Sequence, residues 1–181
     1  TMDSIKEIKL TALQQAVEEA HDADKTAFFF DTTAAADRFY NYTGTLIECA
    51  RKQIAKAMGS TTVDEIKEDY RRSVYFAMKA GKHAVFFFDK VVPNFNSDYF
   101  DESTTPDCIF TPSQFEKEAV YKATLKGDED EDNFGNKGGF EMNSDFRAVV
   151  LSQAETNDEE YWGQLNERLP VDSFMFFKIV N

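Results

Sequence analysis

The sequence predicts an α/β domain in which a parallel sheet is covered by helices. Two short runs, Thr26–Asp31 and His83–Asp89, are almost continuously apolar, and each ends in an acid. Continuous apolar runs of this length are typical of strands that are buried on both faces. The segments between and after these runs carry apolar residues at helical spacing. Strands that alternate with helices in this way form parallel sheets.

The first element that we expect is a helix over residues 4–22. Ser4 and Glu7 have the spacing of a capping box, in which each residue binds the other's backbone amide. Apolar residues from Ile5 to Ala20 then recur near helical spacing. The first buried strand follows, and a polar connection over residues 31–42, helical in part, leads away from it.

The middle of the chain predicts two more helices. Residues 46–58 show one helical apolar pattern, which Gly59 interrupts. Thr62 and Glu65 form a second capping box and open a helix that continues to Met78. Gly81 is placed to end this helix in the left-handed conformation, directly before the second buried strand.

The last part of the chain continues the alternation of helices and strands. Thr111 followed by Pro112 is typical of a helix start. The expected elements are a helix over residues 111–123, an acidic mobile loop over 127–139, a strand over 146–151, a helix over 159–169 and a strand over 173–180. We find no internal repeat, so residues 1–181 are expected to form a single domain.

The composition and net charge limit the classes of partner that this protein is expected to bind. The chain has 181 residues, with 20 Lys and Arg against 33 Asp and Glu, and a net charge of −13. This balance argues against nucleic acid and against an anionic membrane surface, which both need clustered positive charge. It favours a protein partner, which would be basic, or a cation. Two cysteines, no signal peptide and no membrane-spanning apolar run predict a cytoplasmic protein.

The sequence gives little support for catalysis or metal binding by histidine or cysteine side chains. The chain has two histidines, His21 and His83, and no nucleophile elbow, C-x-x-C pair or H-E-x-x-H motif. Cys49 lies in an apolar pattern, which favours a buried structural thiol. The sequence thus gives no positive evidence for an enzyme, and we expect no bound cofactor.

The connection after the first strand stands where a P-loop enzyme binds phosphate. Such a loop needs glycines, whose backbone amides surround the phosphates, and a lysine. Here Asp31 is followed by Thr32, Thr33 and three alanines, whose Cβ atoms oppose turns of positive φ. The second strand ends in Asp89, as a metal-supporting strand does, but Lys90 replaces the glutamate that polarises water. If a nucleotide binds, we expect Asp31, Thr32, Thr33 and Asp89 to contact it.

Several of these segments, in this order, carry a family resemblance. Residues 25–42 resemble the degenerate fifth ATPase-like module of dynein heavy chains and the dynein-related domain of IQ-motif and ankyrin-repeat proteins. Residues 80–89 with Pro93 are similar to that family's second strand and downstream proline. Residues 138–152 resemble its later hairpin and strand, and residues 169–180 its closing segment.

The resemblance implies a P-loop-like, AAA-like fold with a degenerate phosphate loop, which has lost nucleotide hydrolysis. It implies a pseudoenzyme that serves as a structural or docking unit in a ciliary or cytoskeletal assembly. The chain departs from the dynein module because no neighbouring module accompanies it, so motor activity is not implied.

Twelve residues that begin at Asp130 are similar to a calcium-binding loop. Asp130, Asp132 and Glu141 occupy positions 1, 3 and 12, which supply ligands in such loops. Phe134 occupies position 5, where an oxygen ligand belongs, and Lys137 replaces the apolar residue of position 8. The ordinary interpretation is a solvated acidic loop, and a calcium-responsive module is the alternative.

The aromatic residues divide into expected core and expected contact residues. The runs 28–30, 86–88 and 174–177 are strand-like, and we expect them in the core. The candidates for exposed partner contacts are Phe95, Tyr99, Phe100 and Trp162. A basic partner would then meet the nearby Asp98 and Asp101.

The sequence leaves three alternative hypotheses for the function. The first is a non-catalytic, P-loop-like domain that binds other proteins. The second is a nucleotide-binding or phosphotransfer protein with an atypical phosphate site. The third is the calcium-responsive module.

Overall fold

The computed structural model describes residues 4–181 and contains one sheet in which all neighbouring strands are parallel. The six strands are β1 (Lys6–Lys9), β2 (Thr26–Phe30), β3 (Thr45–Glu48), β4 (His83–Asp89), β5 (Arg147–Ser152) and β6 (Phe174–Val180). Their order across the sheet is β1-β6-β2-β5-β4-β3. The predicted α/β class is therefore confirmed.

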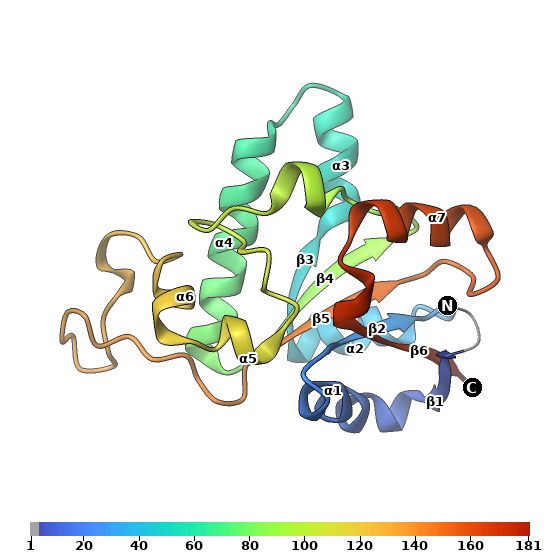
Figure 1. Cartoon of the computed structure of the whole chain (residues 1–181), viewed down its shortest axis with the longest axis horizontal. Coiled ribbons are helices and arrows are strands. Elements are labelled where there is room, and N and C mark those ends of the chain that lie inside the picture. The colour runs from blue at the N-terminus through green and yellow to red at the C-terminus, as the bar shows by residue number, and fades with distance from the viewer. Residues whose placement is uncertain (1–3) are drawn as a thin grey trace.

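Helices cover both faces of the sheet, which gives three layers (Figure 1). The helices are α1 (Leu13–Asp22), α2 (Ala35–Thr43), α3 (Cys49–Ala57), α4 (Val63–Ala80), α5 (Pro112–Phe115), α6 (Glu118–Lys122) and α7 (Glu159–Arg168). On one face, α1 and α2 pack against Phe29 and Phe177 of the sheet. On the other face, α4, α7 and the long connection between β4 and β5 pack against Phe28, Phe86 and Val150.

Phenylalanine side chains make up the centre of the second face. The ring centroid of Phe28 in β2 lies 5.0 to 6.0 Å from those of Phe30, Phe88, Phe174 and Phe176. All five side chains are buried. Offset and edge-to-face aromatic pairs stabilise a core beyond their burial, by about 0.5–1.5 kcal/mol each. The prediction that these aromatic runs form the sheet core is confirmed.

Helix α4 begins and ends as its sequence predicts. The hydroxyl of Thr62 accepts a hydrogen bond from the amide of Glu65, and the Glu65 carboxylate accepts one from the amide of Thr62. Gly81 ends the helix at φ 68°. A Cβ atom at Gly81 would lie only 2.5 Å from the side chain of Asn143. Glycine is thus required here both by the backbone conformation and by the space.

The predicted helix over residues 4–22 is wrong in its first half. Lys6–Lys9 forms β1, an edge strand that pairs with β6, and α1 begins at Leu13. Glu7 lies inside this strand, so it does not take part in a helix cap. Tertiary contacts override the local helical pattern, because residues 6–9 pair with the open edge of β6 and Ile8 becomes buried there.

The single helix predicted over residues 46–58 is a strand followed by a helix. Thr45–Glu48 forms the edge strand β3, which pairs with β4, and α3 begins only at Cys49. Short apolar runs such as Leu46–Ile47 suit either structure, and the free edge of β4 decides between them. The Cys49 thiol is fully buried, as expected, and this burial raises its pKa to about 12.

The helix predicted over residues 111–123 is divided. Lys117 has an extended backbone conformation and separates α5 from α6. The loop that follows is hydrogen-bonded at its base, since Glu129 accepts hydrogen bonds from Arg71 of α4. The strands and the helix predicted after residue 146 all form, within one residue of their expected starts.

Candidate functional site

The candidate site lies between β2 and β5, where the connections of the sheet change direction. The chain leaves β2 into α2 on one face and leaves β5 into α7 on the other. In open α/β sheets, ligands bind in the crevice at the carboxyl ends of such strands. Here that crevice holds a hollow of about 330 Å³, lined by Thr32, Lys90, Gln153, Ala154, Glu155, Asp158 and Tyr161.

The loop after β2 is organised around the carboxylate of Asp31, which is almost completely buried. Its Oδ1 accepts hydrogen bonds from the Thr33 amide at 2.9 Å and the Thr33 hydroxyl at 2.5 Å. Its Oδ2 accepts a hydrogen bond from the amide of Ala36 at 2.7 Å, in the first turn of α2. The amide of Ala36, one of the groups at a helix start that attract a phosphate in P-loop enzymes, is therefore bound by a carboxylate of the chain itself.

The backbone of this loop corrects one expectation. Ala34 adopts φ 58°, although its Cβ atom was expected to prevent a turn of positive φ. Such a conformation costs an alanine about 1–2 kcal/mol. The hydrogen bonds to Asp31 on either side of Ala34 hold the loop in this shape.

A hydrogen-bonded chain joins the loops after β2, β4 and β5. The amide of Asp31 donates to the carbonyl of Ser152, and the Ser152 hydroxyl lies 3.2 Å from the carbonyl oxygen of Asp89. The amide of Gln153 also donates to the Asp89 carbonyl. The Ser152 hydroxyl also donates a hydrogen bond to the Tyr161 hydroxyl, at 2.7 Å. Burial raises the pKa of Tyr161, so its phenol stays neutral.

The structure brings the four predicted nucleotide residues to one edge of the sheet, but in different roles. Thr32 lines the hollow, whereas Asp31 and Thr33 bind each other. Asp89 contributes its carbonyl and adopts φ 53°. No sequence pattern indicates that Glu155 and Asp158 line this hollow, since only the order of the strands shows that the loop after β5 adjoins the loop after β2.

The charges of the hollow do not favour a triphosphate. Among the described residues that line it, Lys90 is the single cation, and Glu155 and Asp158 are acids. Asp158 caps α7 by accepting a hydrogen bond from the Tyr161 amide, and Asp31 accepts one from the Ala36 amide in the first turn of α2. Both helix N-termini that open on this crevice are thus already bound by carboxylates, which repel a phosphate.

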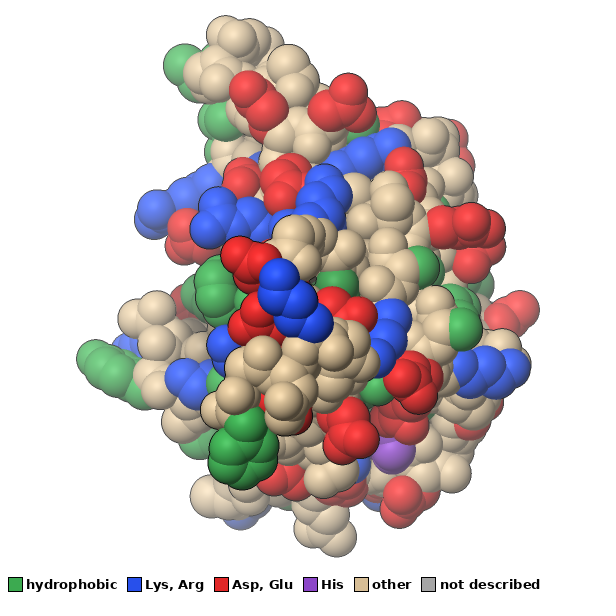
Figure 2. All heavy atoms as spheres, turned by 90° about the vertical axis from the view of Figure 1, so that its left-hand side faces the viewer, with side chains coloured by type: hydrophobic (Ala, Val, Ile, Leu, Met, Phe, Trp, Pro, Cys, Tyr) green, Lys and Arg blue, Asp and Glu red, His purple; other side chains and the backbone are tan. Residues whose placement is uncertain are grey.

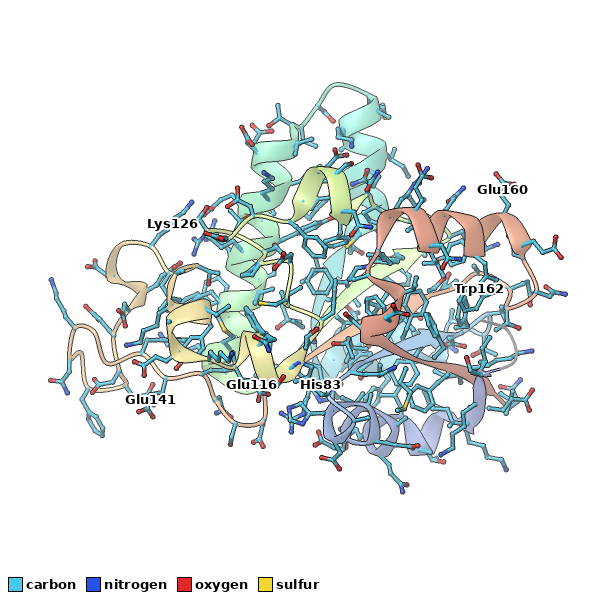
Figure 3. All side chains as sticks on the ribbon, in the orientation of Figure 1. His83, Glu116, Lys126, Glu141, Glu160 and Trp162 are labelled. Atoms are coloured by element: carbon cyan, nitrogen blue, oxygen red, sulfur yellow. The ribbon has the colours of Figure 1, made fainter. Side chains whose placement is uncertain are left out.

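The histidines lie at the opposite edge of the sheet, where the strands begin. His83 starts β4, and its Nδ1 lies 3.0 Å from the Tyr40 hydroxyl. Burial lowers the pKa of His83. His21 Nε2 lies 2.6 Å from a carboxylate oxygen of Glu116, and Figure 3 shows Glu116 on the same side of the molecule as His83. Neither histidine can therefore act at the hollow.

The calcium-like loop uses its own carboxylates internally. Asp132 Oδ1 accepts hydrogen bonds from the amides of Phe134 and Asn136, both at 2.8 Å. Asp130 accepts one from the amide of Phe140, while Glu141 is exposed (Figure 3). Within residues 4–181, no three His, Cys, Asp or Glu side chains gather as metal ligands would. The geometry gives the calcium site no support.

The aromatic residues expected at a partner surface are mostly buried, which corrects that expectation. Phe95 and Tyr99 belong to the long connection between β4 and β5 and are fully buried, and the ring of Phe95 stacks on that of Tyr70 with 5.7 Å between the centroids. Trp162 packs on Phe30 from the side of α7 that faces the sheet (Figure 3). Phe100 is half-buried against the same core.

The two acids expected to meet a basic partner already have partners in the chain. Asp98 lies 3.9 Å from Lys56, and Asp101 lies 3.4 Å from Lys67. Two hydrogen bonds from Ser103 and the nearby Lys67 lower the pKa of Asp101. Neither carboxylate is left free for a partner's cation.

Comparison of the chain with protein-family models, curated proteins and solved structures finds no match. Among the described residues, 4–181, no helix is long and apolar enough to cross a membrane.

Proposed function

We propose that this chain is a non-catalytic, P-loop-like α/β domain that works by binding other proteins. The observation that carries this proposal is the position of Asp31. Its carboxylate takes the hydrogen bonds of the loop and of the first turn of α2, where a phosphate would bind. The resemblance to the dynein module supplies the setting, a cytoplasmic assembly of the cytoskeleton or cilium.

A nucleotide-binding protein with an atypical phosphate site is the second candidate. The hollow of about 330 Å³ at the switch of the sheet favours it, because Thr32 and Lys90 line this hollow. The acids that line the hollow and cap both helices oppose it. Of the two, the geometry supports the protein-binding domain better.

A thermal melt with and without millimolar Mg-ATP tests the proposal. A ligand at 100 times its dissociation constant stabilises a protein by about 2.7 kcal/mol. For a domain of this size, that raises Tm by roughly 5–11 °C. We expect no shift of this size. A rise of several degrees that disappears in Lys90→Ala and Asp89→Ala would overturn the proposal in favour of the nucleotide-binding protein.

The partner expected from the net charge is basic, and that expectation rests on the acidic surface as a whole. The charge is distributed unevenly, however, and residues 49–82 contain more Lys and Arg than Asp and Glu.

A further inference from the structure

Positive charge gathers on the hairpin that α3 and α4 form. Eight of the chain's 20 Lys and Arg residues lie between Cys49 and Lys82, with only four of its 33 Asp and Glu residues. This segment therefore carries a net charge of +4 in a chain of net charge −13. The hairpin stands out from the sheet in Figure 1, and Figure 2 shows Lys and Arg side chains interspersed with Asp and Glu on the side of the molecule that it presents.

The exposed side of α4 presents an aromatic ring between unpaired cations. Arg72, Phe76 and Lys79 follow one another at helical spacing, and Phe76 is 53% exposed. Within residues 4–181, Arg72 and Lys79 form no ion pair. A groove of about 240 Å³ separates this stripe from α3 and is lined by Lys52, Asp69, Arg72, Ser73 and Phe76. We call it the α4 groove.

The loop over residues 127–141 has the opposite character. It contains six acids and one lysine, and Phe134 at its tip is 90% exposed. We call it the Phe134 loop. Among the described side chains, Glu131 has no hydrogen-bond or ion-pair partner, so its carboxylate is free. An exposed aromatic ring next to a free carboxylate matches an exposed aromatic ring next to a free guanidinium.

Both surfaces lie on the same side of the molecule. Lys79, one turn after Phe76 on α4, lines a second hollow of about 570 Å³ together with Glu131 and Phe134. The Phe134 loop lies at the left of Figure 1, which is the side that Figure 2 presents to the viewer. When two complementary surfaces lie side by side, two copies related by a two-fold axis can satisfy both contacts at once and close the assembly.

We propose that two copies of this chain form a symmetric dimer, in which the Phe134 loop of each copy docks in the α4 groove of the other. The inference rests on the proposed function and names one protein partner of the domain. Burial of Phe76 and Phe134 supplies the apolar contact, and Arg72 and Lys79 meet the acids of the loop. The contact consists of one loop and one groove from each copy, so the dimer is weak, with a Kd on the order of 10 μM.

Sedimentation velocity of the whole chain between about 1 and 200 μM, a range that brackets this Kd, tests the proposal. The wild type is expected to pass from monomer to dimer. Phe134→Ser and Arg72→Glu should each weaken the dimer at least about tenfold, as the loss of a central aromatic or charged contact does. Tyr42→Ser and Arg38→Glu are the matched controls, since both residues are exposed elsewhere, on α2, and should leave the dimer unchanged.

A charge exchange separates this interface from general repulsion. Each copy carries a net charge of −13, so added salt screens the long-range repulsion between copies and also weakens the ion pairs of the contact. Because these two effects oppose each other, the salt dependence of dimerisation does not test the interface. Glu131→Arg should weaken the dimer, and the double variant R72E/E131R should recover most of the wild-type affinity. Far-UV circular dichroism checks that every variant is folded.

Three results would overturn the proposal: a wild type that stays monomeric at 200 μM, a dimer that neither F134S nor R72E weakens, or a double variant without recovery. None of these results bears on the Mg-ATP melt, so failure of the dimer and failure of the proposed function can be told apart.

Discussion

At the scale of the residue, Asp31 decides how the loop after β2 is built. A phosphate loop binds a ligand because its amides have no partner until the ligand arrives. In this chain the Asp31 carboxylate accepts hydrogen bonds from two of the loop's amides, those of Thr33 and Ala36, and it does so from a buried position. The sequence shows the aspartate and the missing glycines. It does not show that the carboxylate folds back onto α2.

Replacing Asp31 by alanine should destabilise the domain. The change removes the acceptor of three hydrogen bonds and leaves the buried Ala36 amide without a partner. The cost of a lost cap and an unsatisfied donor is about 2–4 kcal/mol, or a fall in Tm of roughly 4–16 °C. Thermal unfolding followed by circular dichroism measures it. Asp22→Ala, at the exposed end of α1, is the control and should change stability by less than about 0.5 kcal/mol. An Asp31→Ala variant as stable as the wild type would contradict the described role.

Local rules work well at single residues where the chain needs no distant partner. Helix α4 begins at the Thr62–Glu65 capping box and ends at Gly81, as predicted, because capping and the left-handed turn involve residues that are close in sequence. The same rule fails at Ser4 and Glu7. There Glu7 pairs in the sheet with Lys178 of β6, 171 residues away in the chain.

At the scale of the element, α4 holds the Phe134 loop through one buried arginine. Arg71 binds Glu68 on its own helix at 2.7 Å and Glu129 at the base of the loop at 2.5 Å. It also donates to the carbonyl of Thr124. Its hydrogen bonds are the main cause that lowers the pKa of Glu68 to about 2. The loop was expected to be mobile, and this clamp fixes its start.

Replacing Arg71 by methionine should loosen the loop and destabilise the domain. The change leaves Glu129 and the Thr124 carbonyl without their shared donor. A broken buried ion pair of this kind costs about 3 kcal/mol. Urea denaturation measures the loss, and limited proteolysis should cut the Phe134 loop faster. Arg72→Met changes the next residue, which is exposed and unpaired, and should alter stability by less than about 0.5 kcal/mol. Equal stabilities of the two variants would refute the clamp.

Short elements are where sequence patterns and structure diverge. Leu46 and Ile47 fit a helical pattern, yet they form an edge strand because β4 needs a neighbour. The helix that opens at Pro112 ends after one turn and starts again beyond Lys117. In each case the local pattern permits two structures, and packing selects one.

At the scale of the whole molecule, one sheet separates two layers of core. Because both layers share the same strands, they should unfold together. Trp162 lies in one layer, and helices of both layers contribute to far-UV circular dichroism. We expect the urea transitions of tryptophan fluorescence and of circular dichroism to coincide, as in two-state unfolding of a single domain. Two separate midpoints would contradict the single domain.

The sequence alone determined the class of the fold, the strands at the centre of the sheet and the absence of a glycine-rich phosphate loop. These features depend on continuous apolar runs and on the residues of one connection, and each of these involves only residues that are close together in the sequence. The tertiary structure decided the burial of Phe95, Tyr99 and Trp162 and the meeting of the loops after β2 and β5. It also decided that the α4 groove and the Phe134 loop lie on the same side of the molecule. The reason is that each depends on which distant segments become neighbours. The order of strands in the sheet sets those neighbours, and no spacing along the chain encodes that order.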